Sequence, residues 1–244
     1  MTHGMVAASR SMLPLAREFA DRGSLLPDLP GTGRTTWTTR APTVEEQADL
    51  LAVFLRSLVL PAVDVVGNSA GTQSAVALAT RHPDRVRRLV LIAPVIDPGQ
   101  RQRAENRLPA AVFRPPASTL RPAGTLRRRW SMARQQLTRI GGCSPSLRTL
   151  VVTEYAATGL IRAAGLIRQS LRWAIEDHLP QVTCPTLVVR GDEDEVVSAH
   201  WAHRVADLLP RGDFVQVTGA SHSGQYDRAP DVAGAIAPFL TTPG

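Results

Sequence analysis

The 244-residue sequence predicts an α/β fold in which a mostly parallel sheet carries helices on both faces and a helical lid insertion. Three observations predict this class. Apolar runs of strand length alternate with helical patterns, as they do when helices connect parallel strands. The apolar runs are nearly continuous, which is typical of strands buried on both faces. The alternation is interrupted once, from about residue 97 to residue 180, by proline-rich connectors and helical periodicity.

The amino-terminal part predicts a helix, a short strand and a second helix. Apolar residues at 12, 15, 16, 19 and 20 fall on one helical face, which ends at Arg22-Gly23. The stretch 25–27 predicts a very short strand before a glycine-rich loop. Thr43 and Glu46 have the spacing of a capping box, in which each side chain binds the other residue's backbone N–H. The helix that follows should bury Ala48, Leu51, Ala52 and Leu55.

The rest of the chain supplies the main strands and the remaining helices. Strands are predicted at 62–67, 86–93, 185–190 and 213–218, and helices near 70–81, 198–208 and 229–240. Inside the interruption, an apolar stripe predicts a further helix that carries Leu160, Ala163, Ala164, Ile167 and Leu171. We therefore expect one core made of residues 1–96 and 181–244, with residues 97–180 inserted as a helical cap.

A serine lies between two glycines where a strand should give way to a helix. In VDVVGNSAGTQSAVALA, Ser69 follows the apolar run and precedes small helix-forming residues. Such a serine sits either on an ordinary tight turn or on a nucleophile elbow, which requires an acid and a histidine elsewhere. Asp192 and Asp194 follow the strand PTLVVR, and His222 follows the strand FVQVT. Functional residues gather at the carboxyl ends of parallel strands, so the order serine, acid, histidine predicts a catalytic triad.

These stretches resemble the α/β-hydrolase-fold superfamily, and the resemblance covers nearly the whole chain. It rests on THG at 2–4, PDLPGTGRT at 27–35, GNSAG at 67–71, HPDRVRRLVLIAP at 82–94, CPTLVVRGDED at 184–194 and GASH at 219–222. Each stretch is a weak signal, but their joint order and spacing is specific. The resemblance implies an α/β-hydrolase fold with a cap, and a serine hydrolase that needs neither a metal nor an organic cofactor.

The resemblance also assigns roles to individual residues. Ser69 would be the nucleophile and His222 its general base. The family spacing from Gly191 selects Asp194 as the acid, and Asp192 stays the alternative. The backbone N–H groups of Ala70 and Met5 would form the oxyanion hole, and Asn68, His3 and Gly4 would lie against the substrate.

The beginning of the chain departs from the family pattern. Members of the superfamily have two or three strands before the HG turn, which here lies at residues 3 and 4. We therefore expect the first strands to be missing, including the one that should position Met5. The favoured function is hydrolysis of a small carboxylic ester, lactone or thioester. One alternative is a carbon–carbon bond hydrolase of ring-cleavage products, because the elbow sequence GNS, with Asn68 before the serine, resembles the elbow of those enzymes. Another alternative is a truncated, non-catalytic remnant.

Charge and composition narrow the range of partners. All 28 basic residues are arginines, and the stretch 97–150 has 11 of them against two acids. A solvated helical face explains such a stretch most simply, and an anionic small-molecule substrate is the functional alternative. Phe113 and Trp130 are its only aromatic residues, so nucleic acid is an unlikely partner.

Other sequence features exclude several classes of protein. No apolar stretch reaches the length of a membrane span, and the start has no signal-peptide pattern, so we expect a cytoplasmic protein. Cys143 and Cys184 lie too far apart in the sequence to suggest a disulfide framework or a metal site. His200 and His203 have helical spacing but lack a third ligand, which favours a solvated face over zinc. The oligomeric state stays open.

Overall fold

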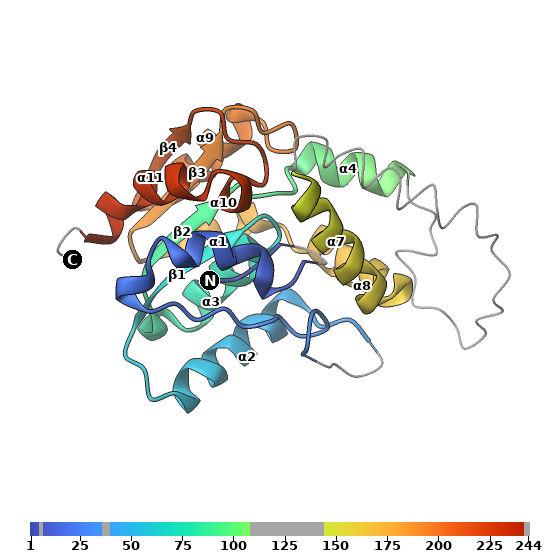
Figure 1. Ribbon diagram of the computed structural model, residues 1–244, viewed down its shortest axis with the longest axis horizontal. Coiled ribbons are helices and arrows are strands. Elements are labelled where there is room, and N and C mark those ends of the chain that lie inside the picture. The colour runs from blue at the N-terminus through green and yellow to red at the C-terminus, as the bar shows by residue number, and fades with distance from the viewer. Residues whose placement is uncertain (5–6, 36–39, 108–143, 242–244) are drawn as a thin grey trace, which may run out of the picture.

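The computed structural model describes residues 1–4, 7–35, 40–107 and 144–241. At its centre is a parallel sheet with the strand order β1-β2-β3-β4 (Figure 1). The strands are β1 (Val63–Asn68), β2 (Val86–Ile92), β3 (Thr186–Gly191) and β4 (Gly212–Val217). Each lies within one residue of its predicted position. The near-continuous apolar runs of β2 and β3 are buried on both faces of the sheet, whereas β4 at its edge is only partly buried.

Helices cover both faces of this sheet (Figure 1). They are α1 (Leu13–Arg17), α2 (Val44–Ser57), α3 (Gly71–Arg81), α9 (Ala199–Leu208), α10 (Gly224–Asp227) and α11 (Ala229–Thr241). Helix α3 packs on β1 and β2, and α9 packs on β3 and β4. Short 3-10 helices lie at Ser9–Met12, Ala20–Arg22, Pro83–Arg85, Ile175–Asp177 and Leu179–Gln181. The helices predicted near 70–81, 198–208 and 229–240 are thus confirmed.

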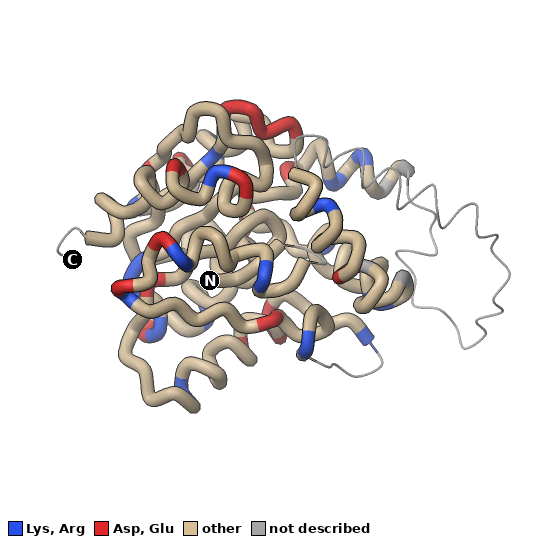
Figure 2. The backbone as a smooth tube through the Cα atoms, in the orientation of Figure 1, with Lys and Arg blue, Asp and Glu red and all other residues tan. Residues whose placement is uncertain are grey.

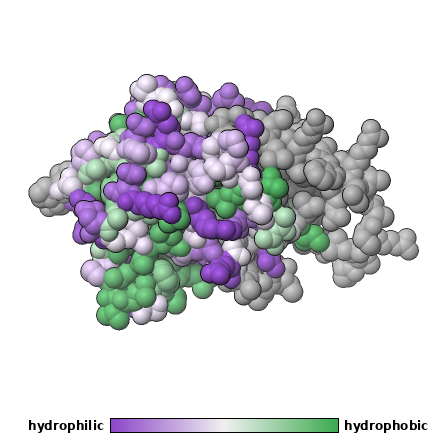
Figure 3. Space-filling model, viewed as in Figure 1, coloured by the Kyte–Doolittle hydropathy of each residue, from purple (hydrophilic) through white to green (hydrophobic). Residues whose placement is uncertain are grey.

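The predicted capping box begins helix α2. The Thr43 hydroxyl accepts a hydrogen bond from the Glu46 N–H at 3.2 Å, and the Glu46 carboxylate accepts one from the Thr43 N–H at 2.9 Å. The predicted inner face of the helix is buried. Its outer face and the following turn expose Leu50, Val53, Leu58 and Val59. Figure 3 shows a hydrophobic region at the lower left of the molecule, on the side where α2 lies in Figure 1.

The segment before α2 is less regular than predicted. The helix expected over residues 12–20 is split into a 3-10 turn, the short α1 and a second 3-10 turn. The strand expected at 25–27 is wrong, because Leu25 accepts its hydrogen bond from the Met1 ammonium and Pro27 has no N–H to extend a ladder. Thr2 does pair with β1, since its N–H donates to Val66 O at 2.7 Å and its carbonyl accepts from Asn68 N at 3.0 Å. This bridge brings residues 3 and 4 to the end of β1.

The described part of the insertion is helical. It contains α4 (Pro98–Arg107), α7 (Pro145–Thr158) and α8 (Leu160–Arg172), and no strand occurs in those residues. The predicted stripe lies on α8, which buries Ala163 and Leu171. No single helix in the described ranges is long and apolar enough to span a membrane; α7 and most of α8, bent by 103°, together have the length and composition of a broken span.

Charged residues of both signs are interspersed along the described backbone (Figure 2). Most arginines of the basic stretch 97–150, including Arg127 to Arg129, fall outside the described residues. Within the described part, Arg101 of α4 pairs with Glu176 at 2.9 Å. The pair links the insertion to the connector that leads to β3.

Candidate active site

Ser69 occupies a strained turn between β1 and α3. Its φ is +52°, a left-handed conformation that non-glycine residues rarely adopt and that costs about 1–3 kcal/mol. The Ser69 N–H donates to Ile92 O on β2 at 2.9 Å, which helps to hold the turn. The two flanking glycines permit close packing: a Cβ on Gly67 would lie 2.8 Å from Gly71 O, and a Cβ on Gly71 would lie 2.4 Å from His3 O. This geometry is that of an elbow rather than an ordinary tight turn.

Three side chains from different strand ends form a chain of hydrogen bonds. His222, after β4, has its Nε2 3.1 Å from Ser69 Oγ. Its Nδ1 lies 3.0 Å from Oδ2 and 3.2 Å from Oδ1 of Asp194, after β3. The Asp194 side chain is fully buried, whereas 23% of the His222 side chain is exposed. The histidine therefore lies between a shielded carboxylate and an accessible serine.

The acid loop is organised around Asp194. Its Oδ1 accepts hydrogen bonds from the N–H groups of Val196 and Val197 at 2.8 and 2.9 Å. Burial alone would raise the pKa of Asp194, but the hydrogen bond and charge of His222, with these two amides, hold its pKa below the ordinary value. The carboxylate is thus kept ionised beside the histidine.

Two further residues hold this loop in place. The buried Arg190 donates to Val197 O at 2.7 Å and to Asp194 O at 3.0 Å. Asp192, the alternative acid, accepts from the Gly219 N–H at 2.7 Å and joins the acid loop to the loop that carries His222. The carboxylate hydrogen-bonded to His222 is therefore that of Asp194, as the family spacing selects.

Backbone groups approach Ser69 from two sides. Ala70 is the N-cap of α3, and its N–H has no hydrogen-bond partner among the described residues. Gly4 packs against the serine, since a Cβ on Gly4 would lie 3.2 Å from Ser69 Cβ and 3.6 Å from its Oγ. Met5, the second expected oxyanion donor, lies outside the described residues.

The side chains of His3 and Asn68 are hydrogen-bonded to other protein groups. The His3 Nδ1–H donates to Gly4 O at 2.9 Å, and its Nε2 accepts from the Leu29 N–H at 2.9 Å. Burial lowers the pKa of His3, so the ring is neutral. The Asn68 amide donates to Gln225 Oε1 of α10 at 3.2 Å. Both side chains thus connect loops at the site, and their contact with the substrate stays a prediction.

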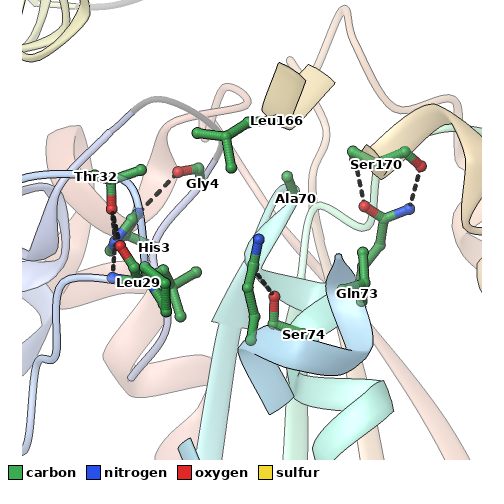
Figure 4. A pocket seen from close by; sticks show the side chains of 12 residues that line it. His3, Gly4, Leu29, Thr32, Ala70, Gln73, Ser74, Leu166 and Ser170 are labelled. Atoms are coloured by element: carbon green, nitrogen blue, oxygen red, sulfur yellow. Dashed lines mark hydrogen bonds between the residues drawn. The ribbon is translucent and has the colours of Figure 1, made fainter. Parts of the chain in front are cut away.

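A small cavity of ≈ 30 Å³ lies beside Ala70 (Figure 4). His3, Gly4, Leu29 and Thr32 lie on one side, with Ala70, Gln73, Ser74 and Ser170 opposite and Leu166 above. Pro30, Val44 and Gln47 complete the lining. Sequence reasoning missed the glutamines and Ser74, because nothing in their local pattern distinguishes them from residues of ordinary helix faces.

No group of three or more His, Cys, Asp or Glu side chains is placed to hold a metal ion in the part of the chain that the structure describes. His200 and His203 lie on α9, where His203 packs against Phe214 with ring centroids 4.0 Å apart.

Comparison with known proteins agrees with this fold. The alpha/beta hydrolase family matches residues 1–235. A 2-(acetamidomethylene)succinate hydrolase of Mesorhizobium japonicum is 28% identical over 90% of this chain and 79% of its own length. A pimeloyl-(acyl-carrier protein) methyl ester esterase of Chromobacterium violaceum is 27% identical over 99% of this chain and 93% of its own. An esterase structure from Thermogutta terrifontis superposes with a TM-score of 0.77 at 22% identity, covering 98% of this chain and 87% of that one. This chain therefore belongs to the alpha/beta hydrolase family of enzymes.

Proposed function

We propose that the protein is a serine hydrolase that cleaves a small carboxylic ester, lactone or thioester through an acyl-enzyme on Ser69. The observation that supports this most is the hydrogen-bonded series Ser69–His222–Asp194 on a strained elbow. A serine hydroxyl is a weak nucleophile until a neighbouring base removes its proton. The distances of 3.1 and 3.0 Å along the series are within the reach needed for that transfer.

In the first half of the reaction, Ser69 Oγ would attack the substrate carbonyl while His222 Nε2 takes the hydroxyl proton. Asp194 would keep the Nδ1–H tautomer of His222 and stabilise the imidazolium that forms. The carbonyl oxygen would gain negative charge. The N–H of Ala70 at the start of α3, which has no partner among the described residues, can donate a hydrogen bond to this oxygen. The dipole of α3 adds favourable potential at that position.

In the second half, His222 would donate its proton to the leaving group, whose bond to the acyl carbon then breaks. Water would next attack the acyl-enzyme with His222 again acting as base, and the acid product would leave Ser69 free. The Met5 N–H is the second oxyanion donor that the family resemblance implies. We assign Leu166 and Ser170 of the helical cap the role of closing the acyl side, because both line the cavity beside Ala70.

The other functions considered from the sequence are supported less well. The hypothesis of carbon–carbon bond hydrolysis rests on the resemblance at Asn68. The side-chain amide of Asn68 is hydrogen-bonded to Gln225 in the structure and adds no support to this hypothesis. A non-catalytic remnant would not need the strained backbone at Ser69, because this conformation lowers the stability of the fold. None of the described residues that line the cavity is charged at neutral pH, so none of them offers a cation to an anionic acyl group.

Labelling with a fluorophosphonate, read by intact mass, tests the proposal. The probe requires an activated serine and depends little on the acyl group. We expect one adduct on the wild-type protein, lost in Ser69→Ala and in His222→Ala. Ser57→Ala and His200→Ala make the same changes at exposed positions and should keep the adduct. A folded wild-type protein that takes no adduct would overturn the proposal.

A further inference from the structure

The cavity beside Ala70 adjoins the reacting serine. Gly4 and Ala70 both line it, and Gly4 is also in contact with the Ser69 side chain. If the carbonyl oxygen of a substrate accepts a hydrogen bond from the Ala70 N–H, one substituent of the carbonyl carbon would point into this cavity. Figure 4 shows the lining residues Gln73 and Ser74 below Ala70, with Leu166 above. The chemistry of this lining therefore bears on which acyl group the enzyme accepts.

Most polar groups of the lining already have partners. The Gln73 amide donates to Ser170 O and Trp173 O, both at 2.9 Å, and its Oε1 accepts from the Ser170 hydroxyl. The Thr32 hydroxyl donates to Leu29 O at 2.6 Å. These side chains hold the cavity in shape but have little hydrogen-bonding capacity left for a ligand.

Gln47 differs from these residues. Its Oε1 accepts from the Ser74 hydroxyl at 2.6 Å, which fixes the side-chain amide between α2 and α3. Only 9% of the residue is exposed, and its Nε2 has no hydrogen-bond partner among the described residues. A side-chain N–H that lines a cavity and has no protein partner there can donate to a ligand, so this position favours an occupant that offers an acceptor.

The size and charge of the cavity limit that occupant. A volume of ≈ 30 Å³ leaves room for only one small group. Leu29, Val44 and Leu166 supply apolar walls. Because none of the described lining residues is charged at neutral pH, a carboxylate would be buried without a counter-ion among them. A neutral oxygen on a short chain meets all of these conditions.

We propose that the cavity is the acyl subsite and that Gln47 selects short acyl groups, of about two or three carbons, that carry a neutral oxygen. Hydroxyacetyl is the simplest example, since its hydroxyl can accept from Gln47 Nε2. The inference rests on the proposed hydrolysis at Ser69. It assigns the specificity for the acyl group to a residue outside the catalytic series.

Paired esters with one leaving group test the inference. Hydroxyacetyl and propionyl esters differ by a hydroxyl in place of a methyl group of similar size. We expect the ratio of their kcat/KM values to fall about two- to tenfold in Gln47→Met and in Gln47→Glu, which both lack the N–H donor. Gln216→Met, an exposed residue on β4, makes the same change away from the cavity and should leave the ratio unchanged. The intrinsic reactivity of each ester cancels when variants are compared.

A series of acetyl, propionyl and hexanoyl esters on the wild-type protein tests the size limit without any variant. Hydrolysis of hexanoyl esters as fast as acetyl esters would overturn the inference, as would an unchanged hydroxyacetyl-to-propionyl ratio in both Gln47 variants. Either result would leave Ser69-dependent hydrolysis intact. If no ester is hydrolysed faster than by Ser69→Ala, the proposed function fails and the acyl subsite fails with it.

Discussion

Replacing Gly71 by alanine should displace the segment that brings Gly4 against Ser69. Gly71 is the first residue of α3, and an added Cβ would lie 2.4 Å from His3 O and 2.7 Å from Thr2 O. Contacts to a Cβ are essentially never shorter than 3.0 Å, so the backbone of residue 3 must retreat by at least about 0.6 Å. These atoms are backbone and cannot move by rotating a side chain.

The expected cost has two parts. Overpacking at such a site typically destabilises by about 1–3 kcal/mol, which alanine's better helix propensity offsets by roughly 0.5–1 kcal/mol. The displacement also weakens the bridge of Thr2 to β1 and moves Gly4, which positions the groups next to Ser69. Misplacement of about 1 Å near the reacting atoms can cost on the order of 10²-fold in rate. We expect a net loss of about 1–2 kcal/mol and a 10- to 100-fold loss in kcat/KM.

Urea unfolding followed by tryptophan fluorescence measures the first effect, and hydrolysis of a short-chain ester measures the second. Gly234→Ala on α11 is the matched control, because an added Cβ there meets nothing within 4 Å. It should be neutral or stabilising by up to about 1 kcal/mol. If Gly71→Ala is as stable and as active as Gly234→Ala, the close approach of residues 2 and 3 to the elbow is not what holds the site.

Four further predictions concern the acid, the elbow and a helix cap. Asp194→Asn should lower kcat/KM by about 10⁴-fold, because the amide favours the wrong tautomer of His222. The pKa of Asp194 lies below its ordinary 3.8, so its ionised form stabilises the native state above that pH and the benefit is lost as the pH falls through the native pKa. The difference in unfolding free energy between wild type and Asp194→Asn should therefore have its full value at pH 6 and become smaller below pH 4. A difference that does not change with pH would contradict the pKa shift. Alanine at Asn68, at Gln225 and at both should give a coupling energy of about 1 kcal/mol in urea unfolding, and additive effects would exclude the hydrogen bond between them. Thr43→Ala should destabilise by about 1 kcal/mol through loss of the α2 cap, whereas an unchanged unfolding midpoint would show that the cap contributes nothing.

The elements that local patterns could predict are those whose pattern is set by burial. The four strands of the sheet and helices α2, α3, α9 and α11 were all predictable, since each buries a periodic face or a continuous apolar run. The Thr43 capping box was predictable because its two hydrogen bonds join residues three apart. The strand at 25–27 could not be judged in this way, because a strand exists only when a neighbour supplies its hydrogen bonds.

The residues around the serine divide along the same line. Ser69, His222 and the loop with Asp192 and Asp194 could be selected because each follows a strand, and parallel strands bring their carboxyl ends together. The choice of Asp194 over Asp192 came from the family resemblance. The hydrogen-bond partners of His3 and Asn68, which are Leu29 and Gln225, lie 26 and 157 residues away and could not be predicted. No local signal marks such a pair before the chain has folded.

The sequence by itself determined the order of strands and helices, the elbow at Ser69 and the acid and histidine that follow later strands, because these depend on periodicity and on short motifs. Only the tertiary structure decided which polar side chains are hydrogen-bonded to one another and which have a donor available for a ligand. Gln47 and Ser74 lie 27 residues apart on two helices, and packing of α2 against α3 makes them neighbours. Hydrogen-bond satisfaction is a property of contacts across the fold, so the specificity proposed for Gln47 could be inferred only after those contacts were known.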